Sequence, residues 1–324
     1  MREFPSSTAV ALCLCLAVVR PAQAQTAVPA ESLFAYQRSA PLLVTDSTVR
    51  AFDDGITLHS LSFESPRGGR ISAYLILPRG QGPFPAVLFG HWGLGTRTEF
   101  IPEALLYARL GAISLLIDWP WTRPPPHHRD EGPLDKPEMD RDVHIQAVVD
   151  LRRSLDLLTT RPDVDPLRLG YIGHSYGAQF GAILGAIDRR LRAVVLMAGV
   201  ADNAALLLET EDPDMVAYRN HWSQEQLTRY IEINTPLDAV GWVGRISPTP
   251  LLMQFAQYDR FTEASMRRYA DAAGEPKTVL WYPTGHELND LQAYVDRATW
   301  MAQRLGLPSP IRLLEGILRT PKRQ

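Results

Sequence analysis

The feature that most constrains the fold is a series of short apolar runs that alternate with helical patterns. Eight segments have the length and composition of strands: 56–63, 71–77, 86–89, 113–117, 167–172, 193–197, 251–255 and 278–281. The last six are mostly apolar instead of alternating, as is typical of parallel strands covered by helices on both faces. The pattern predicts an α/β fold with a mostly parallel central sheet that begins with an antiparallel pair.

Three segments are expected to be helical around this sheet. Residues 143–158 carry apolar side chains at helical spacing on one face, so this helix is predicted to pack on the sheet. A last long helix is expected to begin at Asn289 or Asp290, either of which can cap it, and to end near Arg304. Residues 311–319 are predicted to form a short amphipathic helix.

Two stretches interrupt the alternation. Residues 119–137 contain six prolines and are not expected to form regular helix. Residues 201–247 are too long for a tight connection and are predicted to be partly helical around 224–231, as an insertion or lid after the sixth strand. Trp119, Trp121 and this insertion are expected to line a substrate pocket.

The N-terminus has the pattern of a secretory signal peptide. Residues 8–19 form an apolar core too short to span a bilayer, and Ala22-Gln23-Ala24 matches a cleavage site. We therefore expect a signal peptide over 1–24, one mature domain over 25–324, and an exported protein, periplasmic or secreted. A buried N-terminal helix or an uncleaved anchor is the alternative. The chain's two cysteines lie within 1–24, so the mature protein is expected to have no disulfide.

Composition excludes several classes of protein. The chain is 45% hydrophobic and 21% charged, which is ordinary for a globular protein and not for a disordered one. With 33 Lys and Arg against 36 Asp and Glu, its formal charge is −3. This gives no electrostatic case for binding nucleic acid or, once the signal peptide is removed, a membrane surface. Nothing in the sequence indicates an oligomeric state.

The sequence G-H-S-Y-G at 173–177 carries the predicted chemistry. It matches G-x-S-x-G, and it lies directly between the strand 167–172 and a helical run with glycine every four residues. A serine on such a sharp strand-to-helix turn has strained backbone angles and needs small neighbours. We therefore predict that Ser175 is a nucleophile, the alternative being a serine that merely caps a helix.

A serine hydroxyl needs a base to take its proton and an acid to orient that base. His286 follows the last strand and precedes the last helix, a position from which it can reach the serine. Asp259 follows the strand 251–255, and the order Ser175, Asp259, His286 is the expected one. Asp202, just after the preceding strand, is the main alternative for the acid.

The negative charge that develops on the substrate's carbonyl oxygen during the attack has to be stabilised by backbone N–H groups that converge on that oxygen. Tyr176, next to the nucleophile, is predicted to supply one, and the loop after the strand 86–89 the other, from Trp92 or alternatively Gly93. His127 and His128 lack a convincing third ligand, so no metal site is predicted there. No cofactor is expected.

The chain resembles the α/β-hydrolase superfamily, and within it the dienelactone-hydrolase-like and acetyl-xylan-esterase-like group. The resemblance runs from about residue 71 to 304, and its most specific stretch is T-R-P-D-V-D-P-L-R-L-G-Y-I-G-H-S at 160–175. It implies a central sheet of about eight strands, ester hydrolysis through an acyl-enzyme and no metal. Serine at 175 departs from true dienelactone hydrolases, which use a cysteine.

These observations predict an exported serine carboxylic-ester hydrolase acting on a small-molecule ester through Ser175, His286 and Asp259. Another acyl-transfer enzyme, such as an amidase, thioesterase or acyltransferase, would use the same groups. A non-catalytic binding protein on the same scaffold is the alternative from a different class. Fold alone does not separate these functions.

Overall fold

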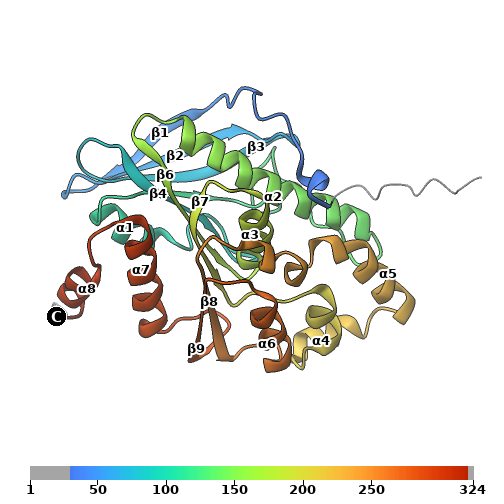
Figure 1. The fold of residues 1–324 in the computed structure, drawn as a ribbon. Helices are drawn as coiled ribbons and strands as arrows, with labels where there is room; N and C mark the ends of the chain where they lie inside the picture. The colour runs from blue at the N-terminus through green and yellow to red at the C-terminus, as the bar shows by residue number, and fades with distance from the viewer. Residues whose placement is uncertain (1–29, 320–324) are drawn as a thin grey trace, which may run out of the picture.

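A nine-stranded mixed sheet between two layers of helices forms the body of the protein (Figure 1). The computed structural model describes residues 30–319. The strands lie in the order β1-β2-β3-β5-β4-β6-β7-β8-β9. Their bounds are β1 (Thr45–Ala51), β2 (Thr57–Glu64), β3 (Arg70–Leu77), β4 (Phe84–Gly90), β5 (Ile113–Ile117), β6 (Val164–His174), β7 (Leu191–Met197), β8 (Leu251–Tyr258) and β9 (Lys277–Gly285).

The sheet changes from antiparallel to parallel at β5. The pairs β1–β2, β2–β3 and β3–β5 are antiparallel, whereas every pair from β5 through β4, β6, β7 and β8 to β9 is parallel. The carboxyl ends of the parallel strands therefore meet at one edge, where α/β proteins place their sites.

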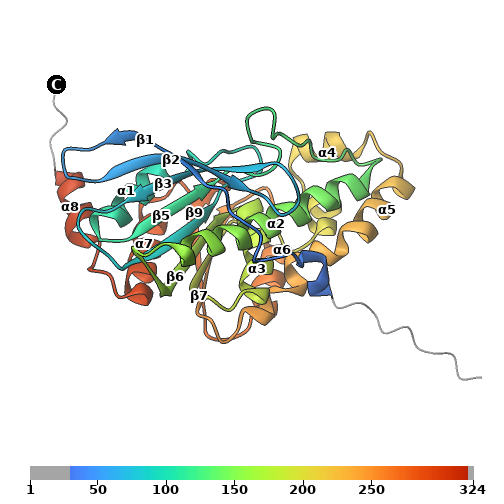
Figure 2. The ribbon, with the colours of Figure 1, turned by 90° about the horizontal axis from the view of Figure 1, so that it is seen from above.

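Helices cover both faces of the sheet and bury a separate core under each. On one face α2, α3 and α6 contribute to a core that includes Phe180. On the other face α1 and α7 contribute to a core that includes Tyr107. Helices α8 and α5 lie toward opposite ends of the molecule in both views (Figure 1, Figure 2). The longer helices are α1 (Ile101–Arg109), α2 (Pro137–Thr160), α3 (Tyr176–Ile187), α4 (Pro213–Arg219), α5 (Gln224–Asn234), α6 (Glu263–Ala272), α7 (Leu291–Leu305) and α8 (Ile311–Arg319).

The predicted α/β class and the eight predicted strands are confirmed, but the expected count of about eight is one too low. The additional strand is β1 (Thr45–Ala51), which pairs with β2 at the edge of the sheet. All seven of its residues are exposed. A strand with no buried face has no apolar pattern, so the sequence carried no signal for it.

The helical predictions hold, with sharper boundaries. Asp290, and not Asn289, caps α7, because its carboxylate accepts from the Ala293 N–H at 2.9 Å. The proline-rich stretch has no helix before α2 begins at Pro137. Residues 201–247 contain α4 and α5 together with short helices, namely η2 (Ala205–Glu209), η3 (Thr235–Leu237), η4 (Ala239–Gly241) and η5 (Val243–Ile246). A further short helix, η1 (Ala30–Phe34), precedes β1.

The expected signal peptide, residues 1–24, lies outside the described residues. Within 30–319, none of the helices combines the length and apolar character needed to cross a bilayer.

The turn between β6 and α3 is the most constrained part of the backbone. Ser175 has φ 55° and ψ −111°, in the left-handed half of backbone space that residues with a side chain rarely adopt. The turn also lies against the end of β4: a Cβ on Gly177 would come within 2.0 Å of the Gly90 carbonyl oxygen. A Cβ on Gly173 would come within 2.2 Å of the Gly177 oxygen. Glycine at 173 and 177 is therefore required by space.

We expect Gly177→Ala to lower the free energy of unfolding by about 1–3 kcal/mol, because the new methyl group must displace backbone. Gly185→Ala on the same helix is the matched control. There a Cβ meets side-chain atoms of Ile246 and Val194, at 3.2 and 3.3 Å, and no backbone oxygen at 2.0 Å. Denaturant unfolding of both variants measures the difference. Equal losses would show that the approach to Gly90 is not the constraint.

Candidate active site

Three predicted residues meet at the carboxyl edge of the parallel strands. Ser175 follows β6, Asp259 follows β8 by one residue, and His286 follows β9. Because β6, β8 and β9 run in the same direction, their following turns lie at the same edge of the sheet. The structure thus brings together side chains that are up to 111 positions apart.

Their side chains form a continuous hydrogen-bonded series. His286 Nδ1–H donates to Asp259 Oδ1 at 2.9 Å, and His286 Nε2 lies 3.0 Å from Ser175 Oγ. The Asp259 side chain is fully buried and that of His286 is 8% exposed. Because the carboxylate can only accept, it keeps the proton on Nδ1 and leaves Nε2 to accept from the serine hydroxyl.

Asp202, the alternative acid, has other partners. Its Oδ1 accepts from the Ala205 N–H at 2.7 Å, and its Oδ2 pairs with Arg268 at 3.1 Å. The Asp202 carboxylate is therefore occupied by Arg268 and by the amide of Ala205, the first residue of η2. Of the two candidates, Asp259 is the one beside His286.

The geometry favours Gly93 over Trp92 as the second anion-binding amide. The Trp92 N–H already donates to Glu99 Oε2 at 2.9 Å. Among the described residues, the amides of Gly93 and Tyr176 have no hydrogen-bond acceptor. Gly93 also lies against the Tyr176 ring, which a Cβ there would approach to 3.1 Å. The expected Trp92 position is thus one residue early, because the carboxylate of Glu99 occupies its amide.

Glu99 and His174 connect the loops around this site. His174 Nε2–H donates to the His286 carbonyl oxygen at 2.9 Å, so the proton on Nε2 is assigned. His174 Nδ1 lies 2.7 Å from Glu99 Oε1, while the other oxygen of Glu99 holds the Trp92 amide. The pair thus links the turn at Ser175, the His286 loop and the Trp92 loop. Glu99 was missed from sequence because it lies in a loop with no motif.

His91 supports the same loop as a neutral ring. Burial lowers the pKa of His91 to about 4, despite a hydrogen bond to the Trp92 carbonyl that acts in the opposite direction. Its Nδ1–H donates to that carbonyl at 2.6 Å, and Nε2 accepts from the Trp119 N–H at 3.3 Å. The ring shapes the loop and is not available as a base.

A cavity of about 420 Å³ opens beside Ser175 and His286. Both interruptions of the α/β pattern contribute to its walls, the proline-rich loop through Leu134 and the insertion through Leu206, Leu207 and Met215. The expected contribution of Trp119 and Trp121 is wrong: they are 0% and 8% exposed and do not line the cavity. The two tryptophan rings instead belong to the core behind the cavity, where they pack on Phe180.

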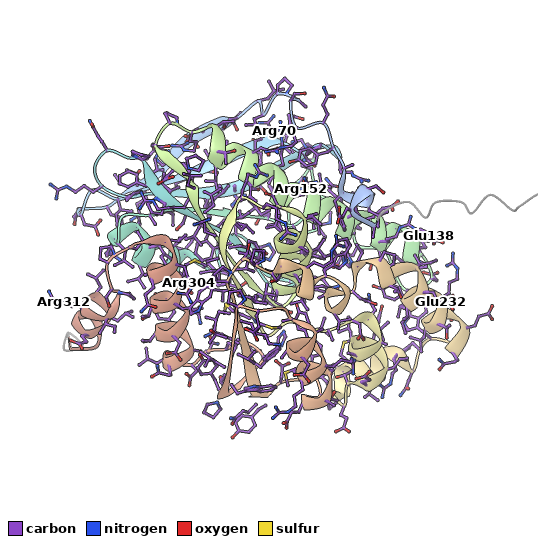
Figure 3. The ribbon with its side chains drawn as sticks, viewed as in Figure 1. Arg70, Glu138, Arg152, Glu232, Arg304 and Arg312 are labelled. Carbon is purple, nitrogen blue, oxygen red and sulfur yellow. The ribbon has the colours of Figure 1, made fainter. Side chains whose placement is uncertain are left out.

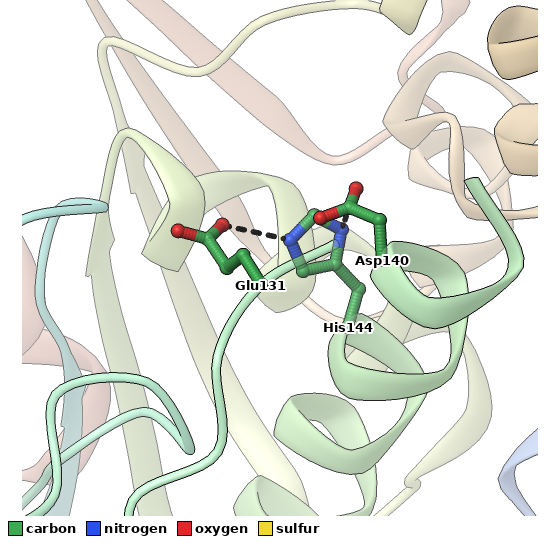
Figure 4. A group of neighbouring side chains, drawn as sticks. All are labelled: Glu131, Asp140 and His144. Carbon is green, nitrogen blue, oxygen red and sulfur yellow. Dashed lines mark hydrogen bonds and ion pairs between the residues drawn. The ribbon is translucent and has the colours of Figure 1, made fainter. Parts of the chain in front are cut away.

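Two residues of the same cavity, Glu131 and Asp140, form a charged group with His144 (Figure 4). His144 lies between the carboxylates: Nε2–H donates to Glu131 Oε1 at 3.1 Å, and Nδ1 faces Asp140 Oδ2 at 3.5 Å. Burial acts to lower the pKa of His144, but Asp140 and Glu131 outweigh it and raise the pKa.

This arrangement is that of an ion-paired imidazolium. A metal ion would need a deprotonated ring nitrogen, and here each nitrogen faces a different carboxylate. No motif marks this group in the sequence, although Asp140 and His144 are four residues apart at the start of a helix, which places them on one face. His128, considered earlier with His127, instead pairs with Asp130 at the surface.

Comparison with known proteins supports the family expected from the sequence. The family model "Acetyl xylan esterase (AXE1)" matches residues 47–200. "Esterase FrsA" of Klebsiella pneumoniae subsp. pneumoniae is 27% identical over 262 residues, which cover 77% of this chain and 60% of that protein. The chain thus spans about 60% of the length of the curated relatives it matches.

Solved structures share the fold. An acetyl xylan esterase from Paenibacillus sp. R4 superposes with a TM-score of 0.70 at 19% identity, covering 86% of this chain and 92% of that one. Acetyl xylan esterase 1 from Thermoanaerobacterium sp. JW/SL YS485 gives a TM-score of 0.68 at 19% identity, over 85% and 92% of the two chains.

We expect a fluorophosphonate probe to label the protein at Ser175. Asp259→Asn should slow labelling by at least about a hundredfold, because the imidazole loses its tautomer and its charge partner. Asp202→Asn is the matched control and should change the rate by less than about threefold, since Asp202 does not touch His286. Mass spectrometry of the labelled peptide measures both effects. If Asp202→Asn slowed labelling strongly and Asp259→Asn did not, Asp202 would be the residue that orients His286.

Proposed function

We propose that the chain, which matches the acetyl xylan esterase (AXE1) family model over residues 47–200 and shares the fold of solved acetyl xylan esterases, is a serine carboxylic-ester hydrolase. The observation that carries the proposal is the series Ser175 Oγ, His286 Nε2, His286 Nδ1 and Asp259 Oδ1, with 3.0 Å and 2.9 Å between partners. Those distances are within the reach needed for proton transfer.

In the proposed reaction, Ser175 Oγ attacks the ester carbonyl carbon while its proton passes to His286 Nε2. The amides of Tyr176 and Gly93 hold the resulting oxyanion. His286 then gives the proton to the alcohol oxygen as the C–O bond breaks, leaving an acyl group on Ser175. Water, deprotonated by the same nitrogen, releases the acid. Buried Asp259 stabilises the imidazolium formed in both halves of the cycle.

The substrate class follows from the size of the cavity and from the relatives. A cavity of about 420 Å³ must hold both the acyl and the alcohol part, which suits a small ester. The structural relatives are named for acetyl esters of xylan. We therefore propose a short acyl group, with acetate as the first candidate.

We expect the mature chain to hydrolyse p-nitrophenyl acetate and butyrate faster than the octanoate, as measured by kcat/KM. Ser175→Ala should lower kcat/KM by at least about a thousandfold, because the covalent route is lost.

Undiminished activity in Ser175→Ala would contradict serine catalysis. Absence of hydrolysis in both proteins, together with absence of fluorophosphonate labelling, would favour a non-catalytic binding protein.

We also propose that the protein is exported. The support is the twelve-residue apolar segment 8–19 followed by Ala22-Gln23-Ala24. When the full chain is expressed in a bacterial host, N-terminal sequencing of the exported protein should begin at Gln25. A chain retained in the cytoplasm with Met1 intact would overturn this proposal.

A further inference from the structure

The group of Glu131, Asp140 and His144 beside the cavity has more negative than positive charge. Two carboxylates share a single imidazolium, which leaves one negative charge in excess. Asp140 is occupied further by the Tyr230 hydroxyl, which donates to Oδ2 at 2.5 Å. Glu131 comes from the proline-rich loop, and Asp140 and His144 come from the first two turns of α2. Glu131 and Asp140 line the cavity, and His144 lies between them.

Glu131 is the member of the group that a ligand can reach. Its side chain is 29% exposed, whereas those of Asp140 and His144 are 4% and 6% exposed. His144 is itself held in place by the rings of Trp121, Tyr176 and Phe180, whose centroids lie 5.3–5.4 Å away. The imidazolium therefore fixes the position of the Glu131 carboxylate without neutralising the whole group.

Among the other lining residues, three tyrosines are neutral and one arginine is positively charged. Burial and these carboxylates raise the pKa values of Tyr176, Tyr218 and Tyr230, so all three phenols stay neutral and present aromatic surface. Arg260 is the one arginine that lines the cavity, and it is exposed at the boundary with a neighbouring depression. That depression also contains Glu211, Asp212 and Glu287.

An accessible carboxylate in such a cavity discriminates between substrates by charge. A hydrocarbon end would remove water from Glu131 and offer no donor in exchange, and a carboxylate would be repelled. A protonated amine would supply both the donor and the opposite charge, and the phenol rings would stabilise it further. We propose that Glu131 is a specificity-determining residue that selects esters carrying a protonated amine. This inference rests on the proposed esterase function.

The test compares esters that match in shape and differ in charge, at pH 7. For the acyl side, the p-nitrophenyl esters of 6-ammoniohexanoate, heptanoate and adipate carry an ammonium, methyl and carboxylate end. For the alcohol side, 2-(dimethylammonio)ethyl acetate is compared with 3-methylbutyl acetate. Each kcat/KM is divided by the rate of uncatalysed hydrolysis of the same ester at pH 7, where the ammonium group keeps its proton, which removes differences in intrinsic reactivity.

On the acyl side, the alcohol side or both, we expect the normalised kcat/KM of the ammonium ester to exceed that of the neutral ester of the same shape by about tenfold. This is the size of a charge-assisted contact that is partly solvated. Glu131→Gln keeps the shape and an acceptor for His144, and it should reduce the preference, measured as the ratio of the two normalised kcat/KM values, to below about twofold. Glu138→Gln is the matched control. Glu138 pairs with Arg229 at the surface, near the labelled Glu232 at the α5 end of the molecule (Figure 3), and should keep the full preference.

Two results would overturn the inference. One is a wild-type protein that does not favour the ammonium ester on either side, which needs no variant to establish. The other is a preference that survives Glu131→Gln. Failure of the proposed function is distinguishable, because all esters would then remain uncleaved. In that case calorimetric binding of the same ester pairs to Ser175→Ala decides whether the cavity selects the amine.

Discussion

The close approach of the turn at Ser175 to the ends of β4 and β7 is the constraint on which the site depends. The Ser175 N–H donates to the Met197 carbonyl at 2.8 Å, and the Gly177 N–H donates to the His91 carbonyl at 3.2 Å. The Tyr171 hydroxyl donates to the Gly177 carbonyl at 2.7 Å. These contacts hold a serine with φ 55° in place, and so they point its hydroxyl toward His286 and its neighbouring amide into the cavity.

The carboxylates near the site are held by histidine side chains. Glu99 pairs with His174 behind the Ser175 turn, and Glu131 and Asp140 pair with His144 beside the cavity. An unpaired charge in such positions would be costly, whereas a paired one orients its neighbours. The first pair acts on backbone groups, namely the Trp92 amide and the His286 carbonyl. The second has an excess carboxylate, so it can also act on a ligand.

Residues within a local pattern could be predicted, and residues in loops could not. Ser175 lies in a motif flanked by a strand and a helix, and Asp259 and His286 each follow a strand of the predicted parallel sheet. Glu99 and Glu131 lie in loops whose paths depend on contacts distant in the sequence, so no spacing marked them. The second amide position was one residue off because Glu99 occupies the Trp92 amide.

The sequence by itself determined the α/β class, the order of the strands along the chain, and Ser175 and His286 as two residues at their carboxyl ends. Periodicity and turn chemistry are local properties, and a parallel sheet brings strand ends together whatever the loops do. Only the tertiary structure decided that Asp259 and not Asp202 meets His286, that β1 closes the edge of the sheet, and that Glu131 faces the cavity. These outcomes depend on the paths of long loops and on pairing between distant residues, which no local pattern encodes.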